Sequence, residues 1–143
     1  MRWADFAADA PELAAFGATR LGAAVAYIAT ASAEGTPRVH PVTPIISDEL
    51  YLFMEPKSPK GKDLQRGSAY SLHCGVADSS GGQGEFYVRG HGRLVTDPAE
   101  RARALAAASY APADRYVLFA LSVEFAFMNV YTENEPLRQR WPR

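Results

Sequence analysis

A small group of lysines with one serine is the clearest candidate for chemistry in this chain. It follows directly on the apolar run at 50–54 and consists of Lys57, Ser58, Lys60 and Lys62. Ser58 is a helix-capping residue type and Pro59 suits the first helical position, so a helix to about Arg66 is predicted. Ammonium groups, a hydroxyl and helix-start amides all favour a phosphate. The segment indicates either an anion site or a solvated basic turn.

A second basic pair lies earlier in the chain. Arg38 and His40 are two residues apart in a segment predicted to be extended over 37–46, so their side chains share one face. They either reach the same anion as the lysines or point into solvent at a barrel rim. Three prolines in this segment lack amide donors, which predicts an edge strand or a bulge rather than a central strand.

The elements that must position these residues alternate short strands with few helices. Helices are predicted over 3–21, 58–66 and 97–109, and strands over 23–31, 37–46, 50–54, 69–75, 85–96 and 116–131, the last with a bend near 124–126. Six strands at short spacing favour a mainly β, α+β fold with a small antiparallel barrel over a parallel sheet. We expect one domain spanning 1–143.

Composition narrows the class of protein. The chain has 143 residues, with 15 basic and 16 acidic side chains and a net charge of −1, whereas nucleic-acid binders usually show a basic excess, so no nucleic-acid partner is expected. No apolar run approaches the roughly 20 residues of a membrane span, and the first residues do not resemble a signal peptide. With Cys74 as the only cysteine, no internal disulfide forms, and a cytoplasmic location is expected.

Several site types are excluded by their motifs. The chain has no G-x-S-x-G elbow, no H-E-x-x-H, no phosphate-binding P-loop and no close pair of carboxylates in an apolar setting. The glycine-rich stretch at 78–84 lacks dinucleotide spacing and reads as a hairpin tip. His40, His73 and His91 are irregularly spaced, so no metal site is expected. No side chain stands out as catalytic.

Four motifs occur in an order that is typical of one family. They are Arg38-Val39-His40-Pro41-Val42, Phe53-Met54, Ser58-Pro59-Lys60-Gly61-Lys62-Asp63-Leu64, and Phe86-Tyr87-Val88-Arg89-Gly90 with Gly92 and Arg93. Over roughly 10–130 this set resembles the pyridoxamine 5′-phosphate oxidase-like, FMN-binding split-barrel superfamily. The resemblance implies a six-stranded antiparallel split β-barrel with a few flanking helices, which dimerises and binds two flavins in clefts between the subunits.

The resemblance also implies roles for particular residues. Arg38 and Lys60 would contact the flavin phosphate, assisted by Ser58 and Lys62. The backbone and side chains around His40, Pro41, Val42 and Thr43 would line the isoalloxazine ring, with Phe53 and Met54 packed beside it, and Val39 is counted among the cofactor-binding residues. Trp141 would reach the flavin of the neighbouring subunit. The implied function is an FMN-dependent oxidoreductase that transfers a hydride or electrons to or from a small molecule that the sequence does not identify.

Two departures separate the chain from the oxidases of that family. Pro59 stands where they usually carry a second basic residue, and Thr43 stands where they carry a lysine. The resemblance is therefore to the family rather than to the named oxidase. Two alternatives stay open. One is a deazaflavin-dependent reductase, whose acidic cofactor tail would suit Lys57, Lys62 and Arg66, and the other is a non-catalytic flavin or haem binding protein.

Overall fold

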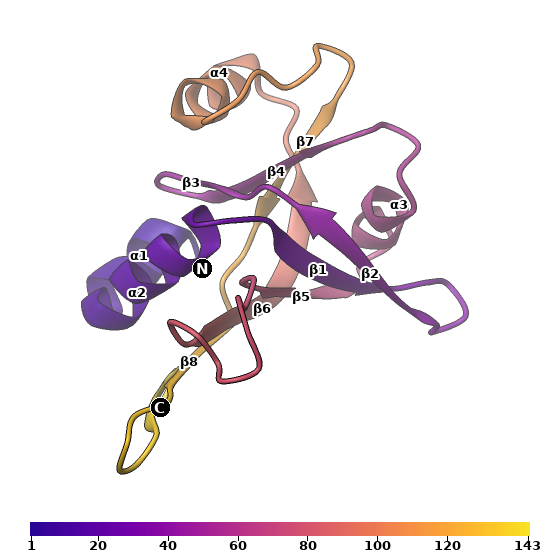
Figure 1. Ribbon diagram of the computed structural model, residues 1–143. Helices are drawn as coiled ribbons and strands as arrows, with labels where there is room; N and C mark the ends of the chain where they lie inside the picture. The colour runs from indigo at the N-terminus through magenta and orange to yellow at the C-terminus, as the bar shows by residue number, and fades with distance from the viewer.

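The computed structural model describes residues 1–143 and contains four helices and nine strands, drawn in Figure 1. The helices are α1 (Trp3–Asp9), α2 (Pro11–Gly22), α3 (Pro59–Gln65) and α4 (Pro98–Ala107). The strands are β1 (Ala26–Ala31), β2 (Pro37–Val42), β3 (Ile45–Ile46), β4 (Leu50–Met54), β5 (Ala69–His73), β6 (Glu85–Leu94), β7 (Val117–Leu121), β8 (Phe125–Val130) and β9 (Leu137–Trp141). None of the helices is both long and apolar enough to cross a bilayer.

The strands form a curled antiparallel sheet. Six of them follow one another in the order β2, β1, β5, β6, β7, β4, and β3 extends this path beyond β4. β2 pairs only with β1, so the barrel stays open beside it. The predicted six-stranded split barrel is confirmed. The count rises to nine because 37–46 divides into β2 and β3, 116–131 divides into β7 and β8, and the tail adds β9.

The division of the proline-rich segment has a simple physical cause. Pro37 and Pro41 lie in β2, which is an edge strand, and Pro44 lies in the break before β3. An edge strand tolerates a residue without an amide donor because one side of its backbone needs no partner strand. The prediction of an edge or bulged strand is therefore confirmed.

β6 changes its neighbour midway along its length. One edge pairs with β5, while the other pairs with β8 through Glu85–Arg89 and then with β7 through Gly92–Leu94. The chain crosses between these neighbours at Ser122, directly beside Gly90. A Cβ atom on Gly90 would lie 2.0 Å from the Ser122 carbonyl oxygen, so only glycine fits at the crossing.

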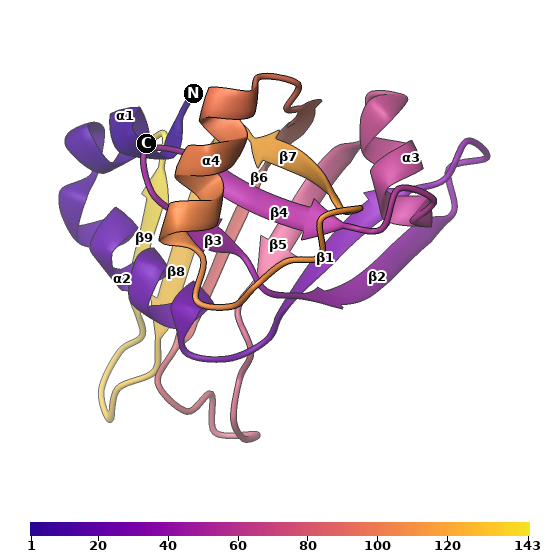
Figure 2. The same cartoon turned by 90° about the horizontal axis from the view of Figure 1, so that it is seen from above.

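The N-terminal helical region is broken, whereas one helix was expected over 3–21. α1 ends at Asp9, and Ala10 has φ −136° and ψ 65° before Pro11 opens α2. Proline cannot donate the amide hydrogen bond of a continuous helix, and it disfavours helical geometry in the residue before it. The two helices cover one end of the sheet beside β8 and β9 (Figure 2).

The core has two parts. The larger one fills the barrel and receives Trp3 and Phe6 from α1, and the smaller one lies between α4 and the outer surface of β4 and β7. All five residues of β4 are buried because its alternate side chains enter the two parts. Leu50, Leu52 and Met54 enter the first part and Tyr51 and Phe53 the second.

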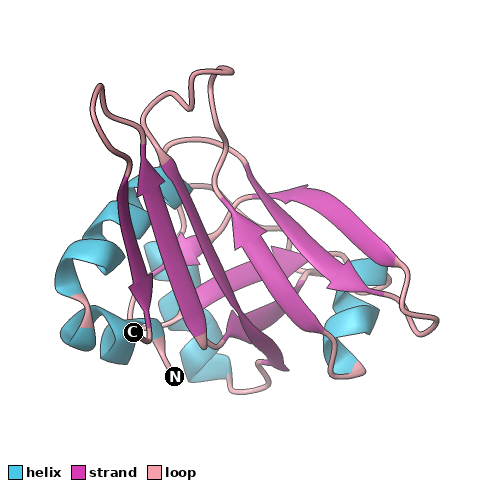
Figure 3. Cartoon of the chain, turned by 90° about the horizontal axis from the view of Figure 1, so that it is seen from below, coloured by secondary structure: helices cyan, strands magenta, loops and turns pink.

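One face of the sheet carries no helix, as Figure 3 shows. Strand register places Tyr27 of β1, His73 of β5, Tyr87 of β6 and Phe127 of β8 side by side across this face. We call these four residues the outer aromatic row. The rings of His73 and Tyr87 are 6.1 Å apart and those of Tyr87 and Phe127 are 5.4 Å apart, while Tyr27 is 48% exposed.

The crossing at Gly90 gives a stability prediction. Replacing Gly90 with Ala forces a methyl group against the Ser122 carbonyl, which should lower the free energy of unfolding by about 1 to 3 kcal/mol or more. Urea denaturation of the variant and the wild type measures this loss. Gly22→Ala is the matched control, since no atom lies within 4 Å of its added Cβ. Equal stability of the Gly90 variant and the wild type would contradict the crossing.

Candidate functional site

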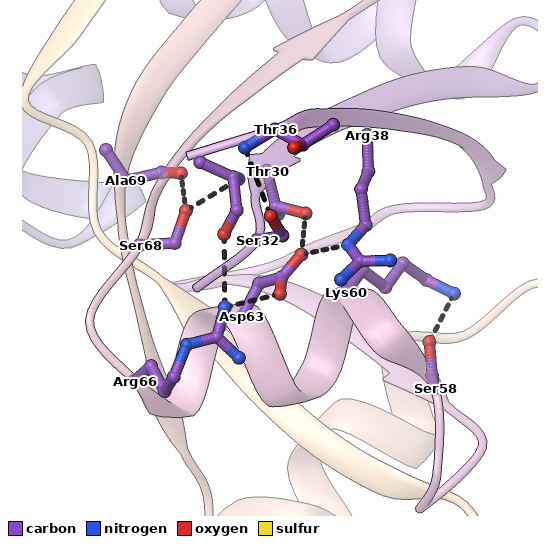
Figure 4. A network of polar contacts seen from close by, with 11 residues as sticks. Thr30, Ser32, Thr36, Arg38, Ser58, Lys60, Asp63, Arg66, Ser68 and Ala69 are labelled. Atoms are coloured by element: carbon purple, nitrogen blue, oxygen red, sulfur yellow. Dashed lines mark hydrogen bonds and ion pairs between the residues drawn. The ribbon is translucent and has the colours of Figure 1, made fainter. Parts of the chain in front are cut away.

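The candidate site lies where α3 faces the edge strand β2 (Figure 4). α3 follows β4 and packs closely on it, because a Cβ at Gly61 would lie only 3.0 Å from the sulfur of Met54. Residues three apart on a helix share a face, so Lys60 and Asp63 both point toward the strands. Lys62 lies on the exposed side of the same helix.

Ser58 and Lys60 form the first part of the site. Ser58 precedes α3 and is only 8% exposed, and its hydroxyl oxygen accepts a hydrogen bond of 3.0 Å from Lys60 Nζ. Burial lowers the pKa of the Lys60 ammonium. Lys60 thus offers a partly buried positive charge with one contact and further hydrogen-bonding capacity. Because α3 has only seven residues, the positive charge at this point comes from the Lys60 side chain more than from the helix as a whole.

Asp63 is the polar centre of the site, and its side chain is 0% exposed. It accepts hydrogen bonds from Thr30 Oγ1 at 2.7 Å, Arg38 Nε at 3.0 Å and Arg66 Nη2 at 2.7 Å. Burial by itself would raise the pKa of Asp63, but the bonds from Arg66 and Thr30 and the two guanidinium charges outweigh it and lower the pKa. Asp63 is therefore a buried, ionised carboxylate with three partners.

Arg38 presents unused donors to the outside. Its Nε is committed to Asp63, its side chain is 39% exposed, and its two Nη groups donate no hydrogen bond within the chain. A guanidinium held by Nε has both Nη groups free on one edge, which suits two oxygens of a phosphate. In Figure 4 Arg38 reaches Asp63 on α3, the helix that also carries Lys60, whose ammonium group points toward Ser58. Both positive charges act on His40, so two cations from different elements lie near it.

His40 completes the cluster. Its Nε2 is buried and makes no hydrogen bond, the only buried side-chain nitrogen or oxygen in the chain that lacks one. Burial lowers the pKa of His40, and the positive charges of Lys60 and Arg38 lower it further, against the opposing charge of Asp63. The imidazole is therefore neutral near pH 7 and lies within the electrostatic reach of both cations.

The structure brings Arg38, His40, Ser58 and Lys60 together but separates them from the other predicted residues of β2. Side chains alternate along a strand, so Val39 and Pro41 lie on the opposite face, where Val39 is 65% exposed. Val42 is buried in the larger core, and Thr43 is exposed after the end of β2. The side chains of these residues are thus divided between the two faces of β2, and their contact with a flavin ring stays a prediction.

Phe53 and Met54 are also separated. Met54 lies in the larger core against α3, whereas Phe53 lies under α4 with the Arg101 guanidinium 5.0 Å from its ring. Consecutive residues of a strand point to opposite faces, which is why these two side chains enter different parts of the core. Their place beside a flavin ring stays a prediction.

Lys62 and Trp141 lie away from the cluster. Lys62 is exposed, and its ammonium group makes no hydrogen bond or salt bridge within the chain. Trp141 belongs to β9, its indole nitrogen donates to Asp9, and its ring lies 5.2 Å from that of Phe6 in the same chain. The tail is therefore a paired strand, which its sequence pattern does not predict. A surface hollow of about 860 Å³ between the start of α2 and β9 includes Trp141 but none of the basic cluster.

Sequence reasoning missed the centre of the site. Asp63, Thr30 and Arg66 were not expected to form a network, and they connect β1, β2 and α3. The available signal was an acidic residue three positions after Lys60 and directly before Leu64, on the face that an amphipathic helix would bury. No group of three or more histidine, cysteine, aspartate or glutamate side chains is arranged to hold a metal ion.

Solved structures with the same fold come from several bacteria. A heme binding protein from Mycobacterium smegmatis has a TM-score of 0.62 and 18% identity over 87% of this chain and 57% of its own. PhzG from Burkholderia lata 383, in complex with tetrahydrophenazine-1-carboxylic acid, has a TM-score of 0.63 and 14% identity over 97% of this chain and 85% of its own. This chain thus spans little more than half of the mycobacterial protein.

A third similar structure carries a family description. It is a Clostridium acetobutylicum protein related to general stress protein 26, of the pyridoxinephosphate oxidase family, with a TM-score of 0.61 and 13% identity over 96% of this chain and 95% of its own. No curated protein matches the chain. A family model described as pyridoxamine 5′-phosphate oxidase matches residues 11–128, which include the whole cluster around Asp63. The chain belongs to the pyridoxamine 5′-phosphate oxidase family.

Proposed function

We propose that the chain is an FMN-dependent oxidoreductase that acts on a small molecule. The observation that carries this proposal is that Arg38 of β2 is bonded to Asp63, one helical turn after Lys60 on the same face of α3, while Lys60 is bonded to the buried Ser58 hydroxyl. Membership of the family supports a flavin as the cofactor. When bound, FMN would supply hydride or electron transfer at its ring, so the protein's part is to bind and orient it.

The residues present fit a phosphate monoester. Arg38 would donate from its free Nη edge, Lys60 from its ammonium group and Ser58 from its hydroxyl, which gives charged donors on two sides of the anion. His40 lies next to both cations with an unpartnered nitrogen, and its environment changes when a dianion arrives. These side chains would distinguish FMN from riboflavin, which lacks the phosphate.

The ring of the flavin would lie along the free edge of β2. That edge has no partner strand, and Val39 and Pro41 stand on its outer face next to β1. The outer aromatic row begins on the same face, since Tyr27 pairs with Pro41 in the sheet. We propose that this uncovered face meets a second copy of the chain and that the homodimer encloses the ring between the subunits.

The absorption spectrum of the purified protein is the direct test. Bands near ~450 nm after FMN is added, retained through gel filtration, would support the proposal because they belong to the cofactor that does the chemistry. Sedimentation of the same sample should show a dimer with two flavins. A Soret band would indicate haem instead, uptake of deazaflavin in preference to FMN would favour a deazaflavin-dependent reductase, and uptake of none of them would refute the proposal.

Lys60 should contribute to FMN affinity. A charge-assisted hydrogen bond is worth about 1.5 to 3 kcal/mol, so Lys60→Ala should weaken FMN binding by on the order of tenfold or more. Fluorescence titration with FMN measures the change. Arg103→Ala removes an equal charge from an exposed position on α4, away from the cluster, and should bind FMN like the wild type. Unchanged affinity in the Lys60 variant would exclude this residue from the phosphate site.

The protonation of His40 should report on the anion. In the folded chain the pKa of His40 lies below the ordinary value of about 6.5. As the pH falls below about 6.5, the imidazole of the unfolded chain is therefore protonated before that of the folded chain. The folded state loses stability over this range. A dianion beside the imidazole should raise the pKa. NMR titration of the His40 ring protons with and without FMN measures both values. A midpoint that FMN leaves unchanged would place the phosphate elsewhere.

A further inference from the structure

We propose that Asp63 is a positioning residue, which holds the Arg38 guanidinium so that its two Nη groups face a phosphate monoester. This inference rests on the proposed function, since the phosphate in question is that of FMN. Asp63 itself is 0% exposed and cannot contact a ligand. Any effect it has on the cofactor must therefore pass through the side chains that it binds.

The choice of nitrogen atom carries the argument. Asp63 accepts from Nε of Arg38 at 3.0 Å and not from either Nη. Contact at Nε fixes the orientation of the planar guanidinium and leaves its outer edge free. An arginine held in this way loses less side-chain freedom when it binds an anion than one that moves freely in solvent. The buried carboxylate thus prepares Arg38 for two parallel hydrogen bonds.

Asp63 also sets the spacing between the two cations. Its oxygens connect Thr30 of β1, Arg38 of β2 and Arg66 at the end of α3, and Arg66 in turn donates to the Ala31 carbonyl. Lys60 is one turn earlier on the same helix face. The distance between the Arg38 and Lys60 side chains therefore depends on how Asp63 attaches α3 to β1 and β2.

Charge and orientation predict opposite results when Asp63 is neutralised. A negative charge beside an anion site repels the anion, so removing it without moving Arg38 should strengthen FMN binding. If Asp63 positions Arg38, removing the charge frees the guanidinium and FMN binding weakens. The sign of the change therefore decides between a positioning role and a purely electrostatic one.

The experiment compares FMN with riboflavin in Asp63→Asn. The ratio of the two dissociation constants isolates the phosphate, because any general disturbance of the ring site affects both flavins. We expect the preference for FMN to fall by about tenfold while riboflavin affinity stays the same. The control is Asp5→Asn, which makes the same change of charge at an exposed aspartate paired with Arg2. A preference that is unchanged or increased in the Asp63 variant would overturn the proposal.

A double-mutant cycle tests whether Asp63 acts through Arg38. In Arg38→Ala the preference for FMN should fall, and adding Asp63→Asn should cause no further loss. An equal additional loss in that background would overturn the proposal. If the Asp63 variant does not fold, the FMN preference is measured in Arg38→Lys instead. Its single ammonium would be taken up by Asp63, so it should lose as much preference as Arg38→Ala, and a lysine variant with the wild-type preference would overturn the proposal.

Binding of inorganic phosphate distinguishes a failure of the proposed function, which requires FMN binding, from a failure of the positioning role of Asp63. A wild-type chain that binds neither flavin, but binds phosphate in a way that Arg38→Ala and Asp63→Asn both weaken, would refute the proposed function and support the role of Asp63. A wild-type chain that binds flavin with an FMN preference insensitive to Asp63→Asn would support the function and refute the positioning role. Binding of neither flavin nor phosphate would refute both.

Discussion

The backbone contact between Gly90 and Ser122 is the constraint on which the architecture depends. It lets β6 keep β5 on one edge while the other edge passes from β8 to β7. The sheet then turns back on itself through β7 and β4. The chain leaves β4 at Met54 and enters α3 at Pro59, and Asp63 of α3 bonds to Arg38 of β2, the strand at one edge of the same sheet. The turn of the sheet thus brings the helix that follows β4 against the edge strand.

The contact between α3 and β2 buries a charged group, the Asp63 carboxylate, which would be unfavourable without bonded partners. A buried carboxylate loses a large hydration energy, which is recovered only if its oxygens are fully bonded. Asp63 achieves this with one hydroxyl and two guanidinium groups drawn from three elements. The same bonds connect the edge strand β2 and the seven-residue helix α3 to the neighbouring strand β1. The Asp63 carboxylate therefore both stabilises the fold through its hydrogen bonds and fixes the positions of the side chains around it.

Much of the fold could be predicted because strand alternation and proline effects act locally. The bounds of β4 follow from its continuous apolar run, the alternating faces of β6 follow from side-chain period, and the edge position of β2 follows from its prolines. The break at Ala10 was missed because a proline can open a helix as easily as interrupt one. The role of Asp63 could not be read from the sequence, since it depends on which helix face meets the barrel and on partners more than twenty residues away in the chain.

The double burial of β4 has a consequence for divergence within the family. Each of its five side chains fills one of two packed cores, so a substitution there alters the packing of the interior whichever way the side chain points. β2 and α3 are less constrained, since their outer residues touch little. New ligand preferences on this scaffold should therefore arise from substitutions in the edge strand and the short helix, while the strand between them in the sequence remains a fixed support.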